Sequence, residues 1–137
     1  MGTLLHDDIA DLLTSGGITT SIYRGFMPEG PDEAVQIVAT PGFGPIHAFA
    51  PSAGMAVEER PTVQIIRRSA SLRRAFAEMN VIWKMLDGAG DRTINGTRYA
   101  WIEALQSPFP LPRDTTDRSE VACNFLISKA VSTATST

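Results

Sequence analysis

The sequence predicts an α+β domain in which a mostly antiparallel sheet carries two helices on one face. Two stretches place apolar residues at helical spacing, and several others alternate apolar and polar residues as strands do. Asn95-Gly96 stands between two runs rich in β-branched and aromatic residues, a strong hairpin signal. The predicted order is helix, three strands, helix, three strands, in a single domain over residues 1–137.

Length and composition limit the class of protein. A chain of 137 residues can bury a conventional core, and 43% hydrophobic with 20% charged residues is ordinary for a globular domain. The formal net charge of −3 gives no sign of general affinity for nucleic acid or anionic membranes. No signal peptide is visible, and no apolar run approaches the roughly 20 residues of a membrane span. We expect a protein made and folded in a cytoplasm.

The first helix is predicted over residues 3–14, with Thr3 as its cap and Ser15-Gly16-Gly17 at its end. Its apolar face consists of Leu5, Ile9, Leu12 and Leu13. Asp7 and Asp8 suit the positive end of the helix dipole, and we expect both to be solvated.

Two strands follow at residues 18–25 and 34–39, and then a segment without regular alternation. Residues 40–59 are rich in Gly, Pro and Ala, which predicts a long loop. The loop carries four large apolar residues: Phe43, Ile46, Phe49 and Met55. Two interpretations stay open, because such a segment suits both an Ω-like loop packed on its own subunit and an arm that docks on another subunit.

The third strand is predicted at residues 61–67 and the second helix directly after it, capped by Ser69 or Ser71. The helix stripe is formed by Leu72, Phe76, Met79, Trp83 and Leu86, with Ala75 and Ile82 in support. Four arginines surround the junction of strand and helix: Arg67, Arg68, Arg73 and Arg74. They fit a phosphate site, ion pairs with a neighbouring subunit, or a solvated surface.

The hairpin around Asn95-Gly96 is expected to be the central pair of the sheet, packed against the second helix. Its second strand spans residues 97–106, with Tyr99, Trp101 and Leu105 on one face and Ile102 on the other. Three prolines then open a long connecting segment at residues 107–118.

The last strand is predicted at residues 120–128 and should pair antiparallel with residues 97–106. Its buried face is formed by Val121, Cys123, Phe125 and Ile127. The connection is too long for a tight turn, so the two strands should extend as an arm or a wide loop. Residues 130–137 are small and polar, which indicates a frayed tail.

No catalytic, cofactor-binding or metal-binding set is predicted. His6 and His47 stand in weak contexts, Cys123 falls on an apolar strand face, and no Cys/His group has zinc-ligand spacing. A hydrolase or nucleic-acid enzyme would need a nucleophile with a base, or a metal cluster. We expect neither an enzyme nor a bound cofactor.

Several segments resemble the minor capsid or tail terminator family of long-tailed phages and related prophages. The resemblance covers residues 4–127 and is densest from Glu58 onward. It is carried by the order and spacing of residues 59–67, the following helix, Ile94–Tyr99, Leu105–Phe109 and Arg113-Asp114.

The resemblance implies a structural virion protein of the tail and neck, assembled in the host cytoplasm. Tail terminators are small α+β subunits that form a ring, usually a hexamer. The ring caps the tail tube at its head-proximal end, stops its elongation and offers a joining surface to the neck. The implied partners are therefore further copies of the chain, the tail tube protein and a head-closure or neck protein. DNA would pass through the lumen without specific binding, which a net negative charge allows.

The candidate contact residues lie in the two segments that are too rich in Pro and Gly for a core. We expect contacts with neighbouring subunits or with the tube from Phe43, Ile46, Phe49, Met55, Phe109, Leu111 and Arg113. A head-closure or connector-type neck protein would need the same ring-forming, loop-bearing subunit and stays an alternative. A small host binding module is a further one.

Overall fold

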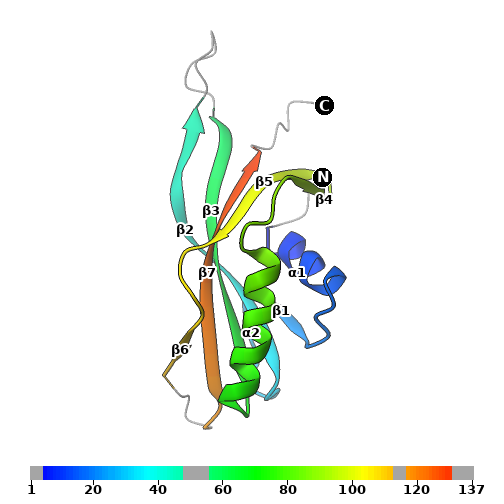
Figure 1. Ribbon diagram of the computed structural model, residues 1–137, viewed down its shortest axis with the longest axis vertical. Coiled ribbons are helices and arrows are strands. Elements are labelled where there is room, and N and C mark those ends of the chain that lie inside the picture. The colour runs from blue at the N-terminus through cyan, green and yellow to red at the C-terminus, as the bar shows by residue number, and fades with distance from the viewer. Residues whose placement is uncertain (1–4, 48–55, 113–116, 131–137) are drawn as a thin grey trace.

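A seven-stranded sheet with two helices on one face forms the body of the protein (Figure 1). The computed structural model describes residues 5–47, 56–112 and 117–130. The helices are α1 (Leu5–Ser15) and α2 (Leu72–Leu86). The strands are β1 (Ile22–Arg24), β2 (Ala34–His47), β3 (Ala56–Ser69), β4 (Arg92–Ile94), β5 (Thr97–Ala104), β6 (Phe109–Leu111) and β7 (Ser119–Ala130). The predicted α+β class and order are confirmed, with the short strand β6 added inside the predicted connecting segment 107–118.

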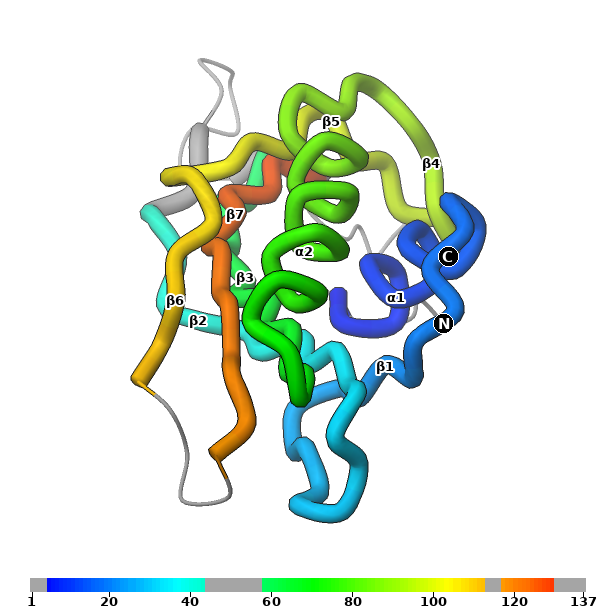
Figure 2. The backbone as a smooth tube through the Cα atoms, turned by 60° about the horizontal axis from the view of Figure 1, so that its bottom comes forward, coloured from blue at the N-terminus to red at the C-terminus, as the bar shows by residue number. Residues whose placement is uncertain are grey.

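The strand order is β1-β2-β3-β7-β5-β4, and β6 also pairs with β7. Every pairing is antiparallel except that of β1 with β2. Both helices pack on the same face, where they bury alternate strand residues, and Figure 2 shows them next to each other. The core there includes Ile37, Ile65, Met79, Phe125 and Ile127, all fully buried.

The second helix is capped by Ser71, one of the two predicted caps. The Ser71 hydroxyl accepts the Arg74 N–H at the N-terminus, and the chain turns away at Asp87. The buried stripe is rotated from the predicted one, because its fully buried members are Ala75, Met79, Ile82 and Leu86. Leu72 is exposed, while Phe76 and Trp83 are half-buried.

The prediction of a loop over residues 40–59 is wrong for residues 40–47 and 56–59, which extend β2 and β3. The prolines and glycines mark β-bulges, which shift the register between Thr40 and His47. At Gly42 a Cβ would lie 2.4 Å from the Arg60 carbonyl oxygen, so glycine is required for this close approach of two strands. Residues 48–55 lie outside the described residues.

The hairpin at Asn95-Gly96 is confirmed, with φ of 51° and 83° at its two turn residues. Its predicted central position is wrong, because β4 is an edge strand and the sheet centre is the β3–β7 pair. The predicted alternation in β5 is correct for Trp101, Leu105 and Ile102 but wrong for Tyr99. A bulge between Tyr99 and Trp101 turns both Tyr99 and Ile102 into the core and leaves Trp101 45% exposed on the other face.

The connection from β5 to β7 extends the sheet instead of leaving it. Strand β6 lies along the first half of β7, and β5 lies along its second half. Gln106 bridges the interruption between β5 and β6, since its side-chain oxygen accepts the Asn124 N–H at 2.8 Å. The Cys123 thiol donates to the Gln106 carbonyl, and burial raises the pKa of Cys123 to about 11. The predicted buried face of β7 is confirmed.

Helix α1 is attached to the hairpin through a buried carboxylate. Asp8 is fully buried and accepts hydrogen bonds from the Tyr99 hydroxyl and from the Asn95 amide, the latter at 2.8 Å. The prediction that Asp8 is solvated is therefore wrong, whereas Asp7 is partly exposed and pairs with Arg24 at 2.9 Å. His6 accepts the Ala39 N–H at 3.2 Å, which attaches α1 to β2 as well.

Three of the four clustered arginines are engaged inside the chain. Arg67 is buried and pairs with Glu33 and Glu78, and Arg74 pairs with Glu33 at 3.0 Å. The Arg68 guanidinium donates to main-chain carbonyls of the segment between β1 and β2. Ion pairs or hydrogen bonds within the chain therefore engage these three side chains, and Arg73 is exposed on α2.

Candidate interaction surface

The sheet has a second face on which neither helix packs. Successive residues of a strand point to opposite faces of the sheet. Gln64 and Ile66 of β3 point away from the helices, and so do the residues of the neighbouring strands that pair with them. We call the open face the side formed by Gln36, Val38, Thr40, Thr62, Gln64, Ile66, Ala122, Asn124, Leu126, Ser128, Trp101 and Glu103. Within the described ranges only strands and the segments that join them contribute to it.

The middle of the open face, on β2, β3 and β7, carries amides and hydroxyls that alternate with the half-buried apolar residues Val38, Ile66 and Leu126. Charged residues of the same face lie around this middle part: Glu103 on β5, and Glu58, Arg60 and Arg68 toward the two ends of β3. Surfaces that pack against other proteins are depleted of charge in their central part in the same way.

An apolar stripe runs along one side of the open face, where β5 and β6 follow β7. It consists of Trp101, Leu105, Phe109 and Leu111, which we call the β5–β6 stripe. Trp101 is 45% exposed and Leu105 is 44% exposed, while Phe109 and Leu111 are half-buried. Large apolar side chains with this much exposure on neighbouring positions are typical of a binding site.

Phe43 lies at the other side of the same face, near the end of the β2–β3 hairpin. The bulge after Thr40 keeps Phe43 in register with Arg60, and the Arg60 guanidinium lies 5.8 Å from the centre of the Phe43 ring. Phe43 is nevertheless 55% exposed. Figure 1 shows the paired ends of β2 and β3 extending beyond α1 and α2 at one end of the molecule.

Three of the seven residues predicted from the sequence therefore lie on one face: Phe43, Phe109 and Leu111. Ile46 is part of β2, where it pairs with Glu58. Phe49, Met55 and Arg113 lie outside the described residues. Sequence reasoning missed Trp101 and Leu105, because without the bulge both are expected in the core.

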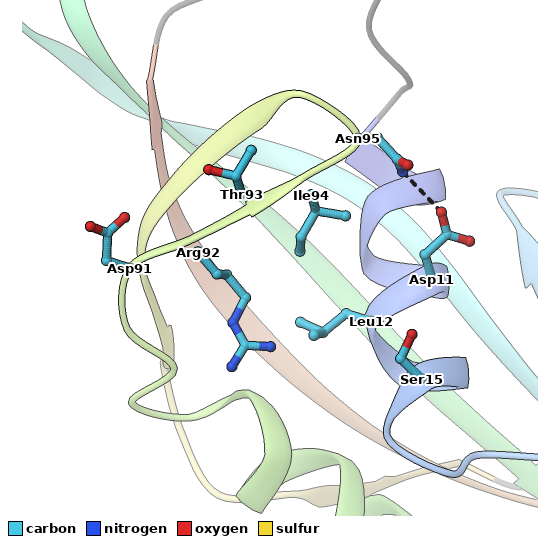
Figure 3. A pocket seen from close by; sticks show the side chains of 8 residues that line it. All are labelled: Asp11, Leu12, Ser15, Asp91, Arg92, Thr93, Ile94 and Asn95. Carbon is cyan, nitrogen blue, oxygen red and sulfur yellow. Dashed lines mark hydrogen bonds between the residues drawn. The ribbon is translucent and has the colours of Figure 1, made fainter.

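A pocket of about 530 Å³ opens between α1 and β4 (Figure 3). Its lining includes Leu12 and Ile94 as the apolar residues, with Arg92 directed toward α1. Asn95 and Asp11 close one side through a 2.9 Å hydrogen bond. None of the eight lining residues is a histidine or a cysteine, and in the described ranges no group of three His, Cys, Asp or Glu side chains could hold a metal ion. Neither of the described helices has the length and apolar character that a membrane span requires.

The fold and this surface define a class: a small α+β protein whose single sheet is covered by helices on one face and, in the described residues, is free of helices on the other. The family comparison is specific. Residues 9–131 match the family described as bacteriophage tail terminator protein, and the chain belongs to that family. It is therefore a structural protein of the virion, with its place in the tail and neck.

The solved structures agree on the fold. A chain of the virion of a native gene transfer agent particle superposes with a TM-score of 0.67 at 17% identity, covering 93% of this chain and 95% of that chain. A search of curated protein sequences found no match. The structural likeness at this identity shows a shared fold over nearly the whole domain.

Proposed function

We propose that the protein forms a closed ring on the head-proximal end of the tail tube, stops tube elongation there and offers a joining surface to the neck. The observation that carries the proposal is the helix-free sheet face with its exposed apolar residues, on a chain that belongs to the tail terminator family. A solitary subunit would leave that apolar surface in water.

Ring closure explains how such a protein can end a polymer. Contacts between unlike surfaces of identical copies continue indefinitely unless the rotation between copies closes them. A closed ring presents no free subunit edge, so a tube that ends in the ring has no site for the next tube subunit. The hexamer expected from the family resemblance is part of this proposal.

The hairpin end is the surface that we assign to the tube. Phe43 is exposed there beside Arg60, and residues 40–47 with 56–60 give the hairpin a rigid paired backbone. Ile46, Phe49 and Met55 belong to the same hairpin in sequence and are proposed as further contacts. Phe109, Leu111 and Arg113 are proposed as contacts between subunits.

A single substitution tests the hairpin better than a deletion, because residues 40–47 and 56–59 pair as strands. We expect Phe43→Ser to leave the fold intact, since the Phe43 side chain is 55% exposed. The amount of protein needed to cap tubes should rise at least about tenfold. The measurement is the length distribution of tubes polymerised from the cognate tube protein, seen by negative-stain electron microscopy.

Val81→Ser is the matched control, because Val81 is 51% exposed on α2, away from the open face. It should shorten and cap the tubes as the wild type does. Tubes that remain capped at the wild-type protein concentration with Phe43→Ser would remove Phe43 from the tube contact. Uncapped tubes with the wild type would contradict the proposed function itself.

A further inference from the structure

Phe26 is the most exposed of the large apolar side chains in the described residues, at 81%. It lies in the segment between β1 and β2, which protrudes from the body in Figure 2. Neither the fold nor the contacts proposed above use this residue. A phenylalanine at this exposure calls for an explanation only if its segment is held in place, since a loose segment could bury it.

The segment is held by two buried arginines from distant parts of the chain. Arg68 of β3 is 4% exposed and Arg118, just before β7, is 6% exposed. Their guanidiniums donate to the carbonyl oxygens of Pro28, Glu29 and Pro31 at 2.5–3.0 Å. Hydrogen bonds from a charged donor are about twice as strong as neutral ones, so these bonds fix the backbone next to Phe26.

The attachment on the other side of Phe26 is equally direct. The Gly25 N–H donates to the Ile37 carbonyl at 2.8 Å, and Gly25 has a φ of 89°, which favours glycine. The Gln36 side chain donates to the Gly25 carbonyl. Phe26 therefore stands between two anchored points, and its exposure is built into the fold. A segment whose backbone is already fixed loses less freedom on binding than a loose one does.

The β5–β6 stripe, which is the apolar surface that Phe26 could contact, lies toward the opposite edge of the same sheet. Strands β2, β3 and β7 separate β1, which leads into Phe26, from β5, which carries Trp101 and Leu105. Phe26, next to β1, and Trp101, in β5, therefore lie toward opposite edges of the sheet in one subunit. Two such subunits placed side by side, in contrast, bring the β1 side of one copy next to the β5 side of the other.

We propose that Phe26 of one copy packs on the β5–β6 stripe of the next copy, at Trp101 and Leu105, and that this contact builds the ring. The proposal rests on the ring formation proposed above and names its interface. The two surfaces are unlike and lie on opposite sides of the subunit, so the contact is heterologous and propagates until it closes. The aromatic anchor and its apolar receptor match the usual make-up of an interface centre.

Cysteine cross-linking tests which surfaces meet. We would assemble the double variant Phe26→Cys with Leu105→Cys on tubes of the tube protein and treat it with a short bis-maleimide. The protein concentration is set well above the wild-type requirement, because both substitutions weaken the proposed contact. Successive copies should become linked into a ladder of covalent oligomers. Native Cys123 should not react, because it is fully buried and its pKa is raised to about 11.

The single variants separate a heterologous contact from a symmetric one. Phe26→Cys mixed with Leu105→Cys should give covalent dimers, and each variant alone should give none. Val81→Cys with Leu105→Cys is the matched control and should give no ladder. A dimer from Phe26→Cys alone, or wild-type-like rings without any link between positions 26 and 105, would overturn the proposed interface and leave ring formation intact. Failure of the wild type to form rings on tubes would contradict the proposed function instead.

A truncation measures the strength of the contact. Phe26→Ala should raise the protein concentration at half-assembly at least about tenfold, because removing an interface aromatic has effects of this size. The variant should unfold at the same temperature as the wild type, since the Phe26 side chain is 81% exposed in the single subunit. Val81→Ala should change neither quantity. Unchanged assembly of Phe26→Ala would contradict the proposal.

Discussion

Replacing Arg67 by methionine is expected to lower the free energy of unfolding by about 3 kcal/mol. The Arg67 side chain is 3% exposed, and its guanidinium lies 2.6 Å from Glu78 and 2.9 Å from Glu33. It also donates to the Arg68 carbonyl. Methionine fills a similar volume but removes the charged donor that the two carboxylates share, and it leaves the Arg68 carbonyl without this bond. Chemical denaturation followed by circular dichroism measures the loss.

Arg24→Met is the matched control, because Arg24 forms an exposed pair with Asp7 at 2.9 Å. Exposed pairs contribute at most about 1 kcal/mol, so this variant should unfold almost as the wild type does. Equal losses from the two substitutions would contradict a special role for the buried pair. Arg67 would then contribute no more to the free energy of unfolding than an exposed arginine does.

The pH dependence offers a second view of the same cluster. Burial by itself raises the pKa of Glu33, but hydrogen bonds from the Ala70 N–H, the Ser69 hydroxyl and Arg67 outweigh it and lower the pKa below 4.5. A lowered pKa contributes stability that is complete above the unfolded value and is lost as the pH falls through the folded value. The difference between wild type and Arg67→Met should therefore shrink as the pH falls below 4.5.

Asp8→Ala is expected to cost a similar amount, about 3 kcal/mol, through a different mechanism. The carboxylate is fully buried and accepts from the Tyr99 hydroxyl and the Asn95 amide. Alanine leaves a buried hydroxyl without its acceptor and removes one of the two carboxylates through which α1 binds Asn95. Asp11→Ala is the control, because Asp11 is exposed and accepts only the Asn95 amide at 2.9 Å among the bonds described. A loss below about 1 kcal/mol from Asp8→Ala would contradict the account.

Tyr99 adds a pH test to this prediction. Burial, and then the hydrogen bond and charge of Asp8, raise the pKa of Tyr99 above its ordinary value of 10.0. A raised pKa contributes stability that is complete below the unfolded value and is lost as the pH rises through the folded value. The wild type should therefore lose stability above pH 10.0, and Tyr99→Phe should lose less over the same range.

Local sequence signals predicted the elements whose cause is local. The Ser71 cap, the alternation in β7 and the positive φ of Asn95 each depend on a few neighbouring residues. The position of the hairpin in the sheet was not predictable in this way, because it depends on which distant strands pair with β7. Bulges mislead for a related reason, since the prolines and glycine that bend β2 look the same in sequence as a loop.

Some residues of the candidate surface could likewise be predicted from neighbouring residues, and others could not. Phe43, Phe109 and Leu111 stand out in sequence as apolar residues among prolines and glycines. Trp101 is exposed only because a bulge reverses the alternation of β5. The order of the segment around Phe26 depends on an arginine, Arg118, that lies 89 residues from its acceptor Glu29. No local pattern could have shown that contact.

We assign the exposed apolar surfaces of the subunit to different partners. The hairpin end with Phe43 is assigned to the tube, and the Phe26 segment and the β5–β6 stripe are assigned to neighbouring copies. The helices bury the opposite face of the sheet and hold these surfaces at fixed positions relative to one another. This arrangement is what a ring that must match a tube requires, since the spacing of its contacts has to stay constant.

Electron cryomicroscopy of the assembled particle would show directly whether the subunit closes into a ring on the tail tube. We expect a closed ring at the junction of tail tube and neck, with the β2–β3 hairpins directed at the last tube ring. We also expect that the Phe26 segment of each copy lies on Trp101 and Leu105 of the next. Density for the subunit on the capsid shell, along the tube, or at the neck as separate copies without a closed ring would contradict the proposed function.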